Sequence, residues 1–179
     1  MDENSKKYIG LESCYDLAKM EYERELERNE KLDNKISMTL TFCGVLFLFV
    51  LKYLNFMEII EYNKVVIDID FMNCLKIIML FLGFSICYFF GKSVYILFSS
   101  IEARGYLHYR SNVIFDKNLP CEDEEKVKYY NTSLLVQATS KNRIVNENRA
   151  KAYNEAINLI KKTAICIAIM EFLFYTFFI

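Results

Sequence analysis

The chain has 179 residues, 54% of them hydrophobic, and its single Pro and five Gly favour long helices with few breaks. The formal net charge of −1 carries little information, because the charges are segregated by region. Six cysteines without a CxxC pair, beside a single His, argue against a metal site and a disulfide framework. The cysteines are predicted to be small buried hydrophobic residues.

Residues 1–35 are predicted to form a cytoplasmic amphipathic helix. Between Leu11 and Ile36 apolar residues recur near helical spacing, while the other faces carry Glu, Lys and Arg. Acidic residues outnumber basic ones, which argues against a basic membrane-surface helix and favours packing on another protein helix. The polar N-terminus is not followed by a short apolar core and a cleavage site, so no removable signal peptide is predicted.

Three apolar segments predict an all-α integral membrane protein with three transmembrane helices and a cytoplasmic helical stalk. The segments are Ile36–Leu51, Ile77–Phe98 and Thr163–Ile179. A hydrocarbon core about 30 Å thick needs about 20 helical residues. The first segment reaches this length if Lys52 snorkels outward and residues 53–57 complete the helix. The third is at the lower limit of length, and it either crosses fully or lies tilted or partly submerged.

The first two spans are predicted to form a hairpin over residues 36–99, with a short external link at residues 58–73. Basic residues are concentrated before span one and in residues 100–162, so both regions are predicted to be cytoplasmic. The acidic residues of the link are Glu58, Glu61, Asp68 and Asp70. They form either the outer mouth of a pore or an ordinary translocated loop without basic residues, and the alternation in KVVIDID also fits a short strand.

The cytoplasmic region, residues 100–162, contains a predicted helix start and a long stalk. Pro120 followed by a run of acids indicates the start of a helix. From Tyr129 to Lys162 there is no Gly or Pro, so one helix is predicted to run into the third span, residues 163–179. Because this stalk is basic and the N-terminal helix is acidic, the two are predicted to pair.

The stalk also carries the candidate ligand-binding residues, Lys141, Arg143, Arg149 and Lys151. With neighbouring amides and Tyr153 they could bind a nucleotide or short oligonucleotide through phosphate contacts and base stacking. Alternatively, they form a solvated helix face whose positive charge complements the acidic N-terminal helix. The stalk is rich in Asn, which lowers helix propensity and indicates that its polar face has a use. The lone His108 is interpreted as a surface or packing residue.

Lys92 and Glu171 are the candidate intramembrane charges. Counted from the cytoplasmic ends of their spans, both lie roughly 9 to 12 Å deep, where a charge needs a partner or an aqueous lumen. Either the two spans form an ion pair, or Glu171 lines an oligomeric pore. A protonated Glu171 bonded to Tyr88 or Tyr175, and a Lys92 that snorkels to the headgroups, are the simpler alternatives.

No nucleophile elbow, P-loop, zinc motif or paired-carboxylate site occurs in the sequence. The loops are also short for a pocket that supports chemistry. The chain is therefore predicted not to be an enzyme and to need no cofactor.

The layout resembles the SLATT-like small bacterial membrane effectors of antiphage nucleotide-signalling systems. The resemblance is carried by KLDNKISMTL (residues 31–40) at the mouth of span one, by the hairpin that follows, and by NRAKAYNEAINLIKK (residues 148–162). It covers most of the chain, which departs from the two-span plan by its third apolar segment. The Hailong-type channel effectors, paired with a nucleotidyltransferase that makes a nucleotide polymer, are the relatives to test first.

This resemblance implies an oligomeric pore or channel in the bacterial inner membrane, with multiple spans and a cytoplasmic N-terminus. Its opening would depolarise the infected cell, under the control of a nucleotide-derived ligand at the cytoplasmic helices. The expected partners are the lipid bilayer, further copies of the chain, the ligand and an operon-encoded nucleotidyltransferase. The alternative function is a non-conducting membrane adaptor whose stalk recruits a partner.

Overall fold

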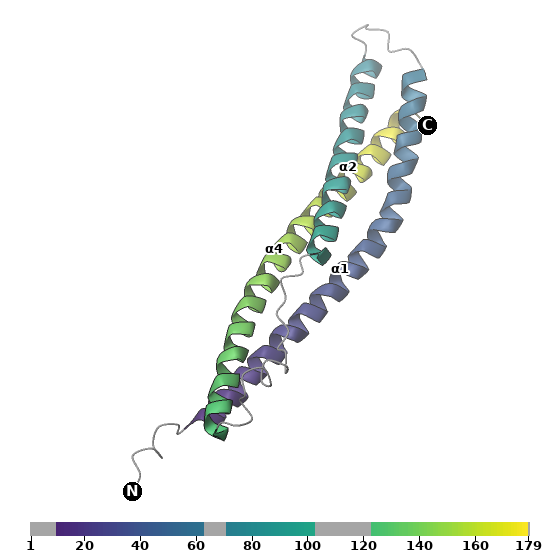
Figure 1. The fold of residues 1–179 in the computed structure, drawn as a ribbon. Coiled ribbons are helices and arrows are strands. Elements are labelled where there is room, and N and C mark those ends of the chain that lie inside the picture. The colour runs from purple at the N-terminus through teal and green to yellow at the C-terminus, as the bar shows by residue number, and fades with distance from the viewer. Residues whose placement is uncertain (1–9, 63–70, 103–122, 179) are drawn as a thin grey trace. The chain divides into compact units, whose positions relative to one another are not determined.

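The described part of the chain is entirely α-helical in this computed structural model (Figure 1). Its helices are α1 (Leu11–Tyr62), α2 (Phe71–Glu102) and α4 (Glu124–Phe178). The structure describes residues 10–62, 71–102 and 123–178, with side chains at residues 10–51, 73–101 and 123–176. The predicted all-α class is confirmed. Residues 63–70 of the predicted acidic link lie outside the described residues, as do the possible strand, His108 and Pro120.

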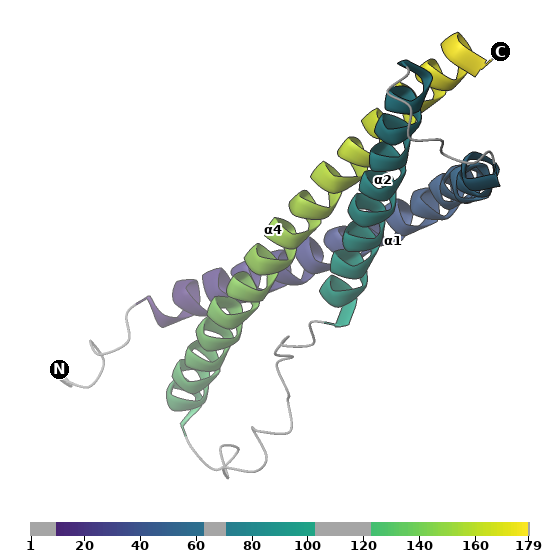
Figure 2. The same ribbon diagram turned by 90° about the horizontal axis from the view of Figure 1, so that it is seen from above.

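Two long helices run without interruption, as the scarcity of Gly and Pro predicts. α1 has 52 residues and continues the amphipathic segment directly into the first apolar segment. α4 has 55 residues and is one continuous ribbon in both views (Figures 1 and 2). Asp123 precedes it, and its backbone oxygen accepts from the amides of Lys126 and Val127 at 2.9 and 3.1 Å. Glu124 and Glu125 in the first turn favour the positive end of the helix dipole.

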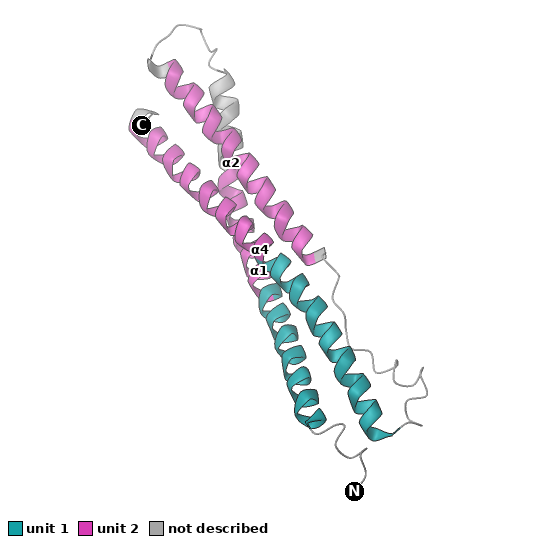
Figure 3. Cartoon of the chain, turned by 90° about the vertical axis from the view of Figure 1, so that its left-hand side faces the viewer, with its two compact units in different colours: residues 1–33, 103–150 teal, residues 34–102, 151–179 magenta. Residues whose placement is uncertain are grey.

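The chain divides into two compact units (Figure 3). Unit 1 comprises residues 1–33 and 103–150, and unit 2 comprises residues 34–102 and 151–179. α1 and α4 contribute to both units, whereas all of α2 belongs to unit 2. Along α4 the boundary between the units falls at residue 150, and beyond it α4 contacts α2, as in the Lys92–Glu155 ion pair.

Unit 1 is built on a parallel pair of helices, α1 and α4. Its buried apolar cluster consists of Ala18 and Tyr22 from α1 with Leu135 and Ala138 from α4. The contacts between the helices progress in the same direction along both, from Glu12 with Lys128 to Asp33 with Arg149. The predicted pairing of the acidic N-terminal helix with the basic stalk is confirmed.

Unit 2 packs parts of α1, α2 and α4 along seams that repeat every seven residues. The buried positions with this spacing are Ile36, Cys43 and Val50 on α1, Met79, Ile86, Ser93 and Ser100 on α2, and Ala156, Thr163 and Met170 on α4. A seven-residue repeat keeps one face of each helix toward its neighbours, with side chains interdigitating as in a coiled coil. Phe47 of α1 also stacks on Phe90 of α2, with ring centroids 6.0 Å apart.

The outward faces of α1 and α2 in unit 2 are strongly apolar. Large exposed side chains include Phe42, Phe47, Leu48 and Phe49 on α1 and Ile77, Phe81, Phe84 and Tyr88 on α2. Two helices, Leu11–Leu51 and Asn73–Ile101, are long and apolar enough to cross a membrane, and only 22% and 28% of their most apolar stretches are buried. This low burial distinguishes them from the core helices of a globular protein.

The predicted third span is not confirmed. The apolar end of α4 follows directly on Lys161 and Lys162 and contains Glu171, so the described residues hold no third stretch of sufficient length and apolarity. The prediction for the cysteines is also partly wrong. Of the five described, Cys43 is buried, Cys14 and Cys74 are exposed, and all are free thiols.

Candidate functional site

A series of charged and amide side chains joins α1 to α4 along the helix pair of unit 1. Lys128 Nζ lies 2.9 Å from Glu12 Oε1, and this hydrogen bond raises the pKa of Lys128. Beside the apolar cluster, an Arg143 nitrogen donates to Glu21 Oε2 at 2.8 Å. The pair of helices is thus held by specific polar contacts as well as by its small apolar cluster.

The centre of this series is buried. Asn146 and Glu25 are 0% and 5% exposed, and Asn146 Nδ2 donates to both the backbone oxygen and Oε2 of Glu25, at 3.0 and 2.8 Å. Arg149, also buried, donates to the side chains of Asn29 and Asp33. Buried polar groups of this kind contribute more to the register and orientation of paired helices than to net stability.

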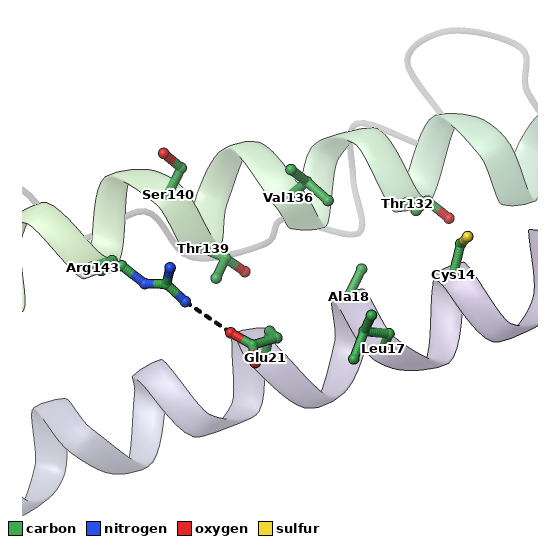
Figure 4. A pocket seen from close by; sticks show the side chains of 9 residues that line it. All are labelled: Cys14, Leu17, Ala18, Glu21, Thr132, Val136, Thr139, Ser140 and Arg143. Atoms are coloured by element: carbon green, nitrogen blue, oxygen red, sulfur yellow. Dashed lines mark hydrogen bonds and ion pairs between the residues drawn. The ribbon is translucent and has the colours of Figure 1, made fainter.

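An open groove of about 420 Å³ runs beside this series, between α1 and α4 (Figure 4). Its lining is mostly apolar, with threonine and serine hydroxyl groups from α4. The lining residues are Cys14, Leu17, Ala18 and Glu21 of α1 and Thr132, Val136, Thr139, Ser140 and Arg143 of α4. The Glu21–Arg143 ion pair lies at one end and Cys14 with Thr132 at the other (Figure 4). The volume is within the range of small-molecule sites.

The four predicted ligand-binding cations do not form one site. Successive residues of a helix are about 100° apart, so Lys141, Arg143, Arg149 and Lys151 point in four directions around α4. Arg143 and Arg149 contact acids of α1, whereas Lys141 and Lys151 are exposed. For the two arginines the structure matches the alternative prediction, in which the basic face of the stalk pairs with the acidic N-terminal helix. Only Arg143 lines the groove.

Tyr153, predicted to stack on a base, is half-buried in unit 2. Its hydroxyl lies 3.2 Å from the Thr39 hydroxyl of α1, so it bridges two helices. The structure thus gives this side chain a packing contact and places it outside the groove.

Lys92 forms an ion pair with Glu155, at 3.2 Å between Nζ and Oε1. Lys92 is thus joined to Glu155 and not to Glu171, the partner that the predicted ion pair between the two spans requires. Glu171 follows Glu155 by sixteen residues on the same helix, which is roughly 24 Å along its axis. The depth was counted from the ends of the apolar segments, but α2 and α4 both continue as helices beyond those ends. Glu171 itself is half-buried.

No family model matches the chain, and comparisons with curated proteins and with solved structures find no match either. The functional proposals below therefore depend on the contacts of the described residues and on the resemblance seen in the sequence.

The most informative residues of this site on α1 are ones that the sequence reasoning did not single out: Glu21, Glu25, Asn29 and Asp33. Their signal was the spacing of alternately three and four residues along α1, through Tyr22, Glu25, Asn29 and Leu32. This spacing is typical of a coiled-coil seam. Acids and amides within such a seam indicate polar contacts buried between two helices.

Proposed function

We propose that this chain is an oligomeric channel of the bacterial inner membrane. The observation that supports it best is the exposed apolar surface of α1 and α2 in unit 2, on helices long enough to span a bilayer. The proposed arrangement has three spans, with the end of α4 as the third, and a cytoplasmic N-terminus.

The Lys92–Glu155 ion pair is proposed to mark the cytoplasmic boundary of the membrane. From Asn73 to Lys92, α2 covers twenty residues, or roughly 30 Å, which equals the thickness of the hydrocarbon core. A charged pair at this boundary keeps contact with water and headgroups, and the exposed Lys161 and Lys162, roughly 10 Å further along α4, would reach the same headgroups by snorkelling. Glu171 then lies within the membrane, where we propose that it lines the pore.

The groove of unit 1 is proposed to hold the regulatory ligand. A phosphate that binds Arg143 would compete with the carboxylates of Glu21 and Glu25, which lie 2.8 and 3.5 Å from its guanidinium nitrogens. Phosphate is a strong bidentate partner of arginine. Its binding would therefore remove contacts that join α1 to α4, and both helices continue from unit 1 into unit 2. This continuity is the proposed link between the ligand and the pore.

The biological role that we propose follows the resemblance to SLATT-like effectors: defence against phage by depolarisation of the infected cell. The ligand would be a nucleotide or oligonucleotide made by a nucleotidyltransferase encoded nearby. The protein itself would be non-enzymatic.

Conductance in planar bilayers tests the channel directly. We expect the purified chain to pass ionic current, and Glu171→Gln to change single-channel conductance or cation selectivity by about twofold or more, because it removes a charge from the proposed lumen. The measurement is the reversal potential and unitary current in asymmetric KCl.

Two controls accompany this test. Glu147→Gln removes an exposed carboxylate from the stalk and is expected to leave the unitary current unchanged. The oligomeric state of Glu171→Gln in detergent must equal that of the unmodified chain. A membrane that stays sealed at every voltage, with and without nucleotides, would contradict the channel and favour the adaptor.

Filling the groove should abolish regulation. Val136→Trp places a large side chain on a groove wall where the native residue is 54% exposed, so the buried seam remains intact. With a panel of mononucleotides and short oligonucleotides as probes, we expect at least about a tenfold loss of apparent affinity. The measurement is the concentration of nucleotide that gives half-maximal change in current.

The matched control is Gln137→Trp, at an exposed position of the same helix that does not line the groove. It is expected to respond like the unmodified chain. Equal nucleotide responses in the two Trp variants would contradict the assignment of the groove as the ligand site.

A further inference from the structure

The outer face of α1 in unit 1 carries two separate charged strips. The buried residues Ala18, Tyr22 and Glu25 define the face that contacts α4. At about 100° per residue, Glu23, Glu27 and Glu30 fall within an arc of about 60°, and Arg24, Arg28 and Lys31 fall within a similar arc centred about 100° further around the helix. We call these the acidic strip and the basic strip. All six side chains are exposed.

The strips match in height along the helix. Each acid is followed immediately by a base, at Glu23–Arg24, Glu27–Arg28 and Glu30–Lys31. One residue corresponds to about 1.5 Å along the axis. A second α1 placed alongside, parallel and at the same level, would therefore bring three acids opposite three bases.

Contacts within the chain use all three bases of the basic strip but only one acid of the acidic strip. Lys31 pairs with Glu27 at 2.6 Å, and Arg28 and Arg24 lie 3.7 and 4.0 Å from the carboxylates of Glu25 and Glu21. Among the described residues, Glu23 and Glu30 form no ion pair. The acidic strip thus retains carboxylates available to a partner.

We propose that the acidic strip of one copy binds the basic strip of the next copy, so that the stalks form a closed ring. This proposal rests on the proposed function, because a shared membrane would hold all copies parallel and at one level. The two strips are different surfaces, so the contact is heterologous, and a heterologous contact repeated by one rotation closes into a ring.

A second copy of this chain is the partner that the charges of the two strips favour. A single chain presents both halves of the contact, with three charges of each sign at matching heights. Individually such exposed pairs are weak, and they act mainly on the choice and orientation of partners.

Charge reversal of each strip tests the ring. The first variant combines Glu23→Lys, Glu27→Lys and Glu30→Lys, and the second combines Arg24→Glu, Arg28→Glu and Lys31→Glu. In each variant like charges meet at every contact, so assembly in detergent at low salt should require at least about tenfold more protein. Coexpression of the two variants under different tags should restore association between them, because strips of opposite sign meet wherever the two variants are neighbours.

Tandem affinity purification and native mass spectrometry measure these outcomes. Recovery of mixed oligomers that contain both variants supports the contact between the strips and shows that neither variant is misfolded. Assembly of either variant alone at the unmodified concentration would overturn the proposal, and so would a mixture that forms no mixed oligomer. Conductance is recorded separately. If the two variants associate with each other but the unmodified chain passes no current, the channel proposal is contradicted while the proposed contact between copies stands.

Discussion

Phe81→Lys should lower the insertion of the chain into membranes by about 100-fold. Phe81 is 69% exposed near the middle of the stretch from Asn73 to Lys92 on α2. A Lys at the centre of a span costs about 3 kcal/mol on insertion scales, and each 1.4 kcal/mol is a factor of ten. At an exposed site of a water-soluble helix the same change would be within about 0.5 kcal/mol. The measurement is the fraction of chain that resists alkaline extraction from membranes.

Phe98→Lys is the matched control for this prediction. Phe98 is 56% exposed on the same helix but follows Lys92 by six residues, roughly 9 Å beyond the proposed boundary. Its replacement is expected to leave extraction unchanged. If the two variants resist extraction equally, α2 does not cross the membrane over the proposed stretch.

Asn146→Leu should destabilise the helix pair of unit 1, whereas a second change at Glu25 should restore it. Asn146 donates two hydrogen bonds to Glu25, one to a carboxylate that is almost fully buried. Removing a donor from a buried charge costs about 2–3 kcal/mol. In the double variant Glu25→Leu/Asn146→Leu that charge is gone, and Arg143 retains its contact with Glu21. Replacement of both partners by apolar residues is often neutral or stabilising.

Thermal unfolding of the full chain in detergent measures this cycle. The single variant should unfold about 5–10 °C lower, and the double variant should return to within a few degrees of the unmodified chain. Asn148→Leu is the control, because Asn148 is exposed on the same helix and its replacement should have little effect. A double variant as unstable as Asn146→Leu would show that the buried Glu25 contributes more through its other contacts.

Charge segregation correctly predicted that the acidic and basic helices pair, but it did not predict which residues meet. Arg143 and Arg149 were candidates for a ligand because they are cations in an Asn-rich helix. Their positions around α4 direct them toward Glu21 and Asp33, more than a hundred residues earlier in the sequence. The register between two helices so far apart in the sequence depends on all the contacts along the seam. It therefore cannot be predicted from any local sequence pattern.

The partner of Lys92 illustrates the same limit. Hydropathy locates the ends of apolar segments, and depths counted from those ends placed Lys92 beside Glu171. The helices extend past those ends, so packing brings Lys92 to Glu155 instead. Hydropathy reports the composition of a segment, whereas depth depends on the level at which neighbouring helices pack.

Helical class, the continuity of α1 and α4 and the positions of the apolar stretches were all predictable from local properties: spacing of apolar residues, helix breakers and hydropathy. Each depends on residues close together in the chain. The packing of α1 against α4 determined the buried Glu25–Asn146 contact, the groove beside it, and which face of α1 is left exposed. These features require the relative rotation and register of helices distant in sequence, which are decided by the sum of many weak contacts.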